Sequence, residues 1–156
     1  MRKSSREVTV FEEQVDILRR CDTVRIGLNN NGLPYIVPLS FGLEVTDTNA
    51  IVLYAHGAPE GQKYDLIQQG GRICIEADIF HCYFNIGPGI TTAYESIIGY
   101  GTIEEVQGAE KLKGMQLICE HCNYDPAAAA QCPILEQTAI FRIVIQEFTG
   151  KRMLAE

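Results

Sequence analysis

The sequence has 156 residues, of which 46% are hydrophobic and 21% are charged, and its formal net charge is −7 at pH 7. This length fits one domain with a buried core, so residues 1–156 are expected to form a single domain. Because no block of basic residues offsets the acidic balance, the composition argues against a general binder of nucleic acid or anionic membranes, and any anionic ligand must be held by local groups.

The start of the chain and its cysteines bear on the cellular compartment. Met1–Arg6 is polar and no apolar run follows it, which argues against a signal peptide. No run of about 18 apolar residues is present, so no membrane span is expected. Six cysteines without an export signal are more typical of free thiols than of disulfides. We therefore expect a cytoplasmic protein.

A helix and a β-hairpin are predicted in the first part of the chain. Apolar residues recur at helical spacing over 10–20, which predicts an amphipathic helix. Alternation predicts a strand over 24–28, and Asn29–Gly32 is a strong turn sequence before a second strand over 35–42. Pro38 in the middle of that strand cannot donate to a ladder, which places the strand at an edge or a bulge. Such a strand either leaves main-chain groups free for a ligand or only protects a sheet edge against aggregation.

The stretch from Tyr54 to Leu66 combines a strand end, a turn and a helix start. A strand over 50–56 leads into a segment rich in glycine and proline, and a helix is predicted over 60–69. Lys63 falls in the first turns of this helix, where backbone N–H groups and a cation both favour an anion. The pattern predicts a phosphate site at Lys63, and the alternative is a plain strand–helix connection with one surface lysine.

The second half of the chain completes a mainly β fold. Three further strands and one helix are predicted: strands over 72–78, 94–106 and 138–148, and a helix over 108–121. Residues 79–93 and 124–133 are expected to be loops, and 150–152 a short basic tail. Without βαβ alternation, six strands and three helices indicate a small antiparallel barrel with peripheral helices.

A cysteine cluster offers a different kind of site. Cys119 and Cys122 form a CxxC with His121 inside it, and Cys132 follows ten residues later. These residues could hold zinc or form a redox pair. No second CxxC or HxxxH pair completes a tetrahedral set, so no metal site is predicted, and the alternative is a helix end with free cysteines.

Six stretches, in chain order, carry a resemblance to a known family. They read CDTVRIGL (21–28), GLPYIVPLSF (32–41), YAHGAPEGQK (54–63), RICIE (72–76), YESIIGYG (94–101) and FTGKR (148–152). Together they resemble the pyridoxamine 5′-phosphate oxidase-like, FMN-binding split-barrel superfamily, and within it the nitroimidazole-resistance (Nim) type flavoproteins. The resemblance implies a six-stranded antiparallel split barrel that forms a homodimer with FMN at the interface.

The resemblance also implies which residues bind FMN. Gln62 and Lys63 stand where the oxidase has an arginine and a lysine for the phosphate, and Ser96 is expected to reach the cofactor, from the same or the other subunit. The complete set of expected cofactor-binding residues is Tyr35, Ile36, Val37, Pro38, Leu39, Tyr54, His56, Gly57, Gln62, Lys63, Glu76 and Ser96.

The activity implied is that of an oxidoreductase that reduces a small organic acceptor, such as the nitro group of a nitroimidazole. His56 is the candidate catalytic residue, because a histidine can deliver a proton at neutral pH; the alternative is a strand-end histidine bonded to main chain. Vitamin B6 oxidation is not expected, since Arg152 alone does not replace that enzyme's C-terminal arginine and histidine pair. A barrel that binds a flavin, a haem or another flat cofactor without turnover is the alternative outside catalysis.

Overall fold

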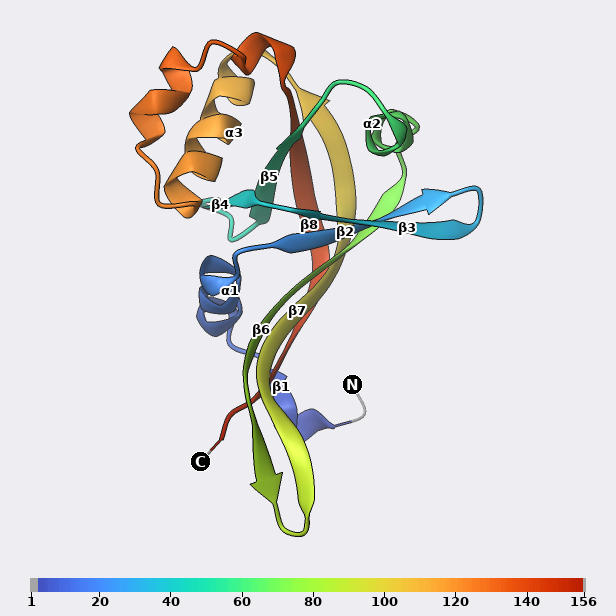
Figure 1. Ribbon diagram of the computed structural model, residues 1–156, viewed down its shortest axis with the longest axis vertical. Coiled ribbons are helices and arrows are strands. Elements are labelled where there is room, and N and C mark those ends of the chain that lie inside the picture. The colour runs from blue at the N-terminus through green and yellow to red at the C-terminus, as the bar shows by residue number, and fades with distance from the viewer. Residues whose placement is uncertain (1–2, 156) are drawn as a thin grey trace.

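The computed structural model describes residues 3–155, and one antiparallel sheet dominates it (Figure 1). The eight strands of this part of the chain are β1 (Glu7–Val8), β2 (Val24–Asn30), β3 (Leu33–Leu39), β4 (Phe41–Val45), β5 (Ile51–Gly57), β6 (Arg72–Ile86), β7 (Gly89–Val106) and β8 (Ala139–Met153). The helices are α1 (Phe11–Arg20), α2 (Gln62–Gln68) and α3 (Gly108–His121), with short 3₁₀ helices η1 (Ser4–Arg6), η2 (Pro126–Gln131) and η3 (Leu135–Gln137). The strand order is β3-β2-β6-β7-β8-β5-β4, and β1 pairs with β8.

The predicted fold class, a mainly antiparallel β-barrel with peripheral helices, is confirmed, although the sheet has eight strands rather than six. The predicted strand over 35–42 is divided at Ser40 into β3 and β4, and β1 forms beside β8. β3 and β4 lie at opposite ends of the strand order although one residue separates them. The sheet must therefore curl until its two ends approach each other, which gives an open barrel.

Pro38 lies on an edge strand, as its missing N–H donor requires. β3 ends the strand order and pairs with β2 alone, where Pro38 stands opposite Arg25.

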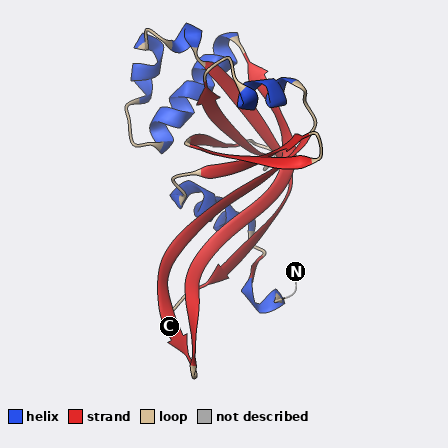
Figure 2. Cartoon of the chain, turned by 45° about the vertical axis from the view of Figure 1, so that its right-hand side comes forward, coloured by secondary structure: helices blue, strands red, loops and turns tan. Residues whose placement is uncertain are grey.

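The prediction of a loop over 79–93 is wrong. β6 and β7 continue through these residues as a hairpin, from the pair Phe80–Tyr94 to the pair Ile86–Gly89, with a tight turn at Gly87, whose φ is 56°. Figure 2 shows this hairpin projecting beyond the rest of the barrel. Pairing with a long partner strand satisfies the backbone groups of residues whose composition alone suggests a loop.

Two smaller predictions also differ from the structure. Residues 150–152, predicted as a tail, belong to β8, where Lys151 pairs with both Glu7 of β1 and Ser96 of β7. The predicted loop over 124–133 contains η2, which begins with Pro126 after a side-chain cap from Asp125.

The interior of the barrel holds one large apolar cluster, and a second cluster lies under α3. The first draws on α1, α2 and strands β1, β2 and β4–β8, with Ile26, Ile75 and Ile97 among its fully buried residues. The second consists of Val52, Tyr54, Val106, Ile118 and Ile140. α3 thus covers the outer side of β5 and β8 and leaves the outer side of β2, β3 and β6 without a helix (Figure 1).

A buried carboxylate joins α1 to the long hairpin. Glu95 of β7 is 3% exposed and accepts hydrogen bonds from both terminal nitrogens of Arg20, at 2.6 and 3.0 Å. The register of β6 shifts between Phe80 and Cys82, and the bulged His81 places its Nε2 3.1 Å from the same carboxylate. The Nη1 of Arg152 in β8 lies 3.7 Å from Oε1 of Glu95. The hydrogen bonds from Arg20 hold the pKa of Glu95 below its usual range.

None of the helices in residues 3–155 has the length and apolar character needed to cross a membrane.

Candidate functional site

A cavity of about 510 Å³ lies where β5 ends. Its wall is formed by His56, Gly57, Ala58, Lys63, Ile134, Gln137 and Thr138. The wall includes two side chains that can carry positive charge, one amide and one hydroxyl, and it contains no carboxylate. This donor set suits an anionic oxygen ligand.

Lys63 enters the cavity from the first turn of α2. Its ammonium lies 6.0 Å from the centre of the Phe141 ring, and no carboxylate of residues 3–155 lies within ion-pair distance of it. Burial lowers the pKa of Lys63, because its charge is partly desolvated without a counter-charge. An anion in the cavity would supply that counter-charge.

Gly57 makes room for this lysine. A Cβ atom at Gly57 would collide with the Nζ of Lys63 and would lie 2.9 Å from its Cε. The last residue of β5 therefore needs to be a glycine for Lys63 to lie across it.

His56 precedes this glycine and is exposed to solvent on one side. Burial of the rest of the ring, and then the charge of Lys63, lower the pKa of His56. Its imidazole is therefore mainly neutral at neutral pH while the cavity is free of anions. A bound anion would counteract the effect of Lys63 and favour the protonated form.

Four other predicted residues, Ile36, Pro38, Glu76 and Ser96, lie on the outer face of the barrel, away from the cavity wall. Pro38, Arg25 and Glu76 form a row across β3, β2 and β6, and the Glu76 carboxylate accepts a 2.9 Å hydrogen bond from Arg25. Ser96 of β7 pairs with Asp78 in the next row on the same face. Ile36 precedes Pro38 by two residues and is also exposed on this face.

The remaining predicted residues have other surroundings. Tyr35, Val37 and Leu39 alternate with the exposed positions of β3 and pack against the barrel interior. Tyr54 is buried under α3, where its hydroxyl donates to Glu44 at 3.3 Å and Glu110 at 3.2 Å. Gln62 is exposed beside Lys63 and is not part of the cavity wall.

The predicted set did not include Ile134, Gln137 and Thr138, which complete the cavity. They reach it because Ala139 at the start of β8 pairs with Gly57 at the end of β5. Only this register brings residues so distant in sequence together, and no local pattern indicates it.

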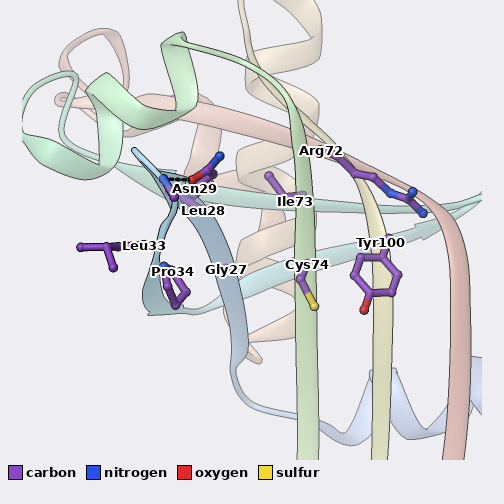
Figure 3. A pocket seen from close by; sticks show the side chains of 10 residues that line it. Gly27, Leu28, Asn29, Leu33, Pro34, Arg72, Ile73, Cys74 and Tyr100 are labelled. Carbon is purple, nitrogen blue, oxygen red and sulfur yellow. Dashed lines mark hydrogen bonds between the residues drawn. The ribbon is translucent and has the colours of Figure 1, made fainter.

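A second cavity, of about 390 Å³, lies on the outer face beside the β2–β3 hairpin (Figure 3). Cys74 and Tyr100 contribute to it, and the guanidinium of Arg72 lies 5.0 Å from the Tyr100 ring. Arg72 is already paired with Glu147 at 2.7 Å. This mainly apolar hollow therefore lacks the uncompensated cation found at Lys63.

The cysteine cluster has no metal-ligating geometry in the part of the chain that the structure describes, since no three His, Cys, Asp or Glu residues there are grouped to hold an ion. His121 has its Nε2 2.8 Å from the carbonyl oxygen of Cys21, and its ring packs against Phe41. Burial raises the pKa of Cys119, which disfavours the thiolate that metal binding requires.

Comparison with known proteins connects this geometry to a family. The family model described as pyridoxamine 5′-phosphate oxidase matches residues 11–152. No curated protein matches the chain.

Several solved structures share the fold. A candidate 5-nitroimidazole antibiotic resistance protein from Bacteroides thetaiotaomicron is 24% identical, with a TM-score of 0.75, over 93% of this chain and 85% of its own. The flavocytochrome Anf3 from Azotobacter vinelandii is 18% identical, with a TM-score of 0.81, over 99% of this chain and 72% of its own. An FAD and heme binding protein from Mycobacterium smegmatis is also 18% identical, with a TM-score of 0.81, over 96% of this chain and 74% of its own.

Proposed function

Because the chain belongs to the pyridoxamine 5′-phosphate oxidase family, we propose that it binds FMN and acts as an oxidoreductase that reduces a small organic acceptor. The observation that carries this proposal is the cavity at Lys63 and His56, whose wall offers hydrogen-bond donors and no carboxylate. A phosphate monoester supplies the negative charge that this wall lacks. Bound FMN would supply the electrons for the reaction.

Lys63 would hold the phosphate, and Gln62 lies beside it at the start of α2. The flavin ring and ribityl chain would extend along β3, whose outer edge has no partner strand among residues 3–155. Glu76 and Ser96 share the outer face with Pro38 and would contact the cofactor there.

A homodimer would bring these two groups of residues to one ligand. Large apolar side chains are exposed on the outer face of β3, β6 and β7, including Ile36, Phe80, Ile98 and Tyr100. Exposed apolar side chains gathered on one sheet face are typical of a protein–protein interface, and here the charged residues Arg25, Glu76 and Asp78 lie among them. A second copy packed on this face would cover the flavin and present its own Ser96.

His56 would donate a proton from its imidazole to the acceptor as electrons arrive. Its pKa is lowered in the free protein by burial and by Lys63. The phosphate of the ligand would neutralise Lys63 and return the imidazole toward its protonated form. Binding of FMN in the cavity would thus favour the protonated imidazole of His56, which is the proton donor.

The similar solved structures support two candidate chemistries. The resemblance to a candidate 5-nitroimidazole resistance protein favours nitro-group reduction. The flavocytochrome and the FAD and heme binding protein favour, as a second candidate, a barrel that holds a flavin or haem for electron transfer without an organic substrate. In both cases we propose a cytoplasmic protein that acts without nucleic acid or membrane.

The test is to purify the protein, record its absorption spectrum and titrate it with FMN. We expect flavin bands and saturation at a ratio that matches the subunit concentration. Lys63→Ala should raise the Kd of FMN by about 10- to 100-fold, because hydrogen bonds to charged groups contribute about 1.5–3 kcal/mol; Lys63→Arg should retain most of the affinity. A protein that ignores FMN would overturn the proposal.

Turnover separates the two candidates. With chemically reduced FMN bound, a 5-nitroimidazole should lose its nitro absorbance, and His56→Gln should slow this step by about 100-fold when both proteins are saturated with reduced FMN, so that a change in the Kd of FMN does not contribute. A flavin-loaded protein that never reduces the nitro compound would favour the electron-transfer candidate.

A further inference from the structure

Residues 134–138 form a wall of the Lys63 cavity to which neither the family resemblance nor the comparisons give a role. Ile134, Gln137 and Thr138 all line the cavity. Because Ala139 pairs with Gly57, this segment passes beside the turn that follows β5. It therefore faces the same cavity as His56 and Lys63.

The backbone of this segment is fixed by its own contacts. The N–H of Gln137 donates to the carbonyl oxygen of Ile134 at 3.0 Å, and the hydroxyl of Thr138 donates to the same oxygen at 2.9 Å. From the other side, the ammonium of buried Lys111 donates to the carbonyl oxygen of Glu136 at 3.3 Å. The wall is thus anchored to α3 and holds its conformation without a ligand.

Gln137 is the member of this wall whose side chain is still available. Its amide has no hydrogen-bond partner among residues 3–155, and it is exposed at the cavity. The Thr138 hydroxyl proton is already committed to Ile134. Apart from Lys63 and His56, the Gln137 amide is therefore the side-chain donor that the wall offers without breaking an existing bond.

The geometry points to Gln137 as a specificity-determining residue whose side-chain amide donates to the phosphate monoester of the ligand held by Lys63. This inference rests on the proposed function, since it needs FMN in the cavity. An amide donor on a fixed wall of the cavity that Lys63 also lines favours a ligand with a phosphate group over the same ligand without it.

The experiment compares FMN with riboflavin, which differs only by the phosphate, through quenching of flavin fluorescence. Gln137→Ala should raise the Kd of FMN by about tenfold, the effect of one hydrogen bond to a charged group, and leave the Kd of riboflavin unchanged. Gln137→Glu keeps the shape but adds negative charge, so it should weaken FMN further and again spare riboflavin. Gln131→Ala is the matched control, because Gln131 is exposed on η2 and lies outside the cavity wall.

The possible results separate this inference from the proposed function. If both Gln137 variants keep the FMN affinity of the wild type while Lys63→Ala loses it, the role of Gln137 is overturned and the cavity stands. If riboflavin weakens as much as FMN, the amide contacts another part of the flavin and the phosphate assignment is wrong. If the wild-type protein does not bind FMN, or Lys63→Ala binds it normally, the proposed site itself fails.

Discussion

Around Glu95, three groups that can carry positive charge surround one buried carboxylate, whereas around Lys63 two such groups share a cavity without any carboxylate. In the first region every charge has a partner within the chain, and the contacts join α1, β6, β7 and β8. In the second, the charge of Lys63 is partly buried and uncompensated. The difference separates a cluster that stabilises the fold from a cluster arranged for something outside the chain.

The largest effect on stability is expected from removal of the carboxylate charge at Glu95. Glu95→Gln should lower the free energy of unfolding by about 2 kcal/mol, since it removes the charge-assisted hydrogen bonds between Arg20 and Glu95, while Arg20 keeps its pair with Asp16 and Arg152 its pair with Glu13. Urea unfolding monitored by circular dichroism measures this. Glu147→Gln is the control, because its pair with Arg72 is exposed and should be worth at most about 1 kcal/mol; equal losses in the two variants would contradict the distinction.

Acid should weaken the Glu95 cluster as its carboxylate becomes protonated. The pKa of Glu95 is lowered in the folded state, so its contribution is complete above the unfolded pKa of about 4.3 and disappears as the pH falls through the folded value. Unfolding of the wild type and of Glu95→Gln should therefore differ most above the unfolded pKa and converge as the pH falls below the folded value. If the difference in stability between the wild type and Glu95→Gln does not depend on pH, the charge of the carboxylate is not its cause.

A methyl group at Gly57 should damage the cavity without damaging the fold. Gly57→Ala pushes the end of Lys63 out of place, and we expect the Kd of FMN to rise about tenfold. Because the displaced atoms belong to a flexible side chain, the stability should change by less than about 1 kcal/mol. Gly89→Ala, in a more open position of β7, serves as the control. Unchanged FMN affinity would mean that Lys63 binds from another position.

Lys63→Met tests the contrast between the two clusters by removing the uncompensated charge instead of the paired one. Removal of an uncompensated, partly buried cation should leave the free protein as stable as the wild type, within about 1 kcal/mol, unlike loss of the Glu95 carboxylate. At the same concentration, FMN should then raise the melting temperature of the wild type more than that of the variant. A variant that is strongly destabilised without ligand would assign Lys63 a structural role.

The smallest expected signal is a change in the pKa of His56. Its value is lowered in the free protein, partly by Lys63, so a bound phosphate group should raise it. Titration of the imidazole signals by NMR with and without FMN measures this shift. His81 and His121 hydrogen-bond within the chain and provide internal references.

The sequence was sufficient for features of the fold with a local cause. Alternating apolar residues predicted most strands, and the proline in β3 predicted an edge, whereas the anion site at Lys63 stays a prediction. The hairpin over 79–93 was missed because its order comes from cross-strand pairing, which local composition does not encode. Ile134, Gln137 and Thr138 were missed for the same reason, since they depend on the pairing of β8 with β5. The predicted roles of the β3 residues, Glu76 and Ser96 stay predictions until a flavin complex is examined.

The placement of β8 also determines when this barrel can be completed. Residues 139–153 pair with β1, β5 and β7, so strands made early in synthesis have no neighbour on one side until the chain has reached this segment. Contacts between segments so far apart in sequence slow folding, because the connecting chain must be ordered before they form. Until then β1, β5 and β7 would each present an unpaired edge to other chains. Nascent chains that stop before residue 139 should therefore depend most strongly on chaperones.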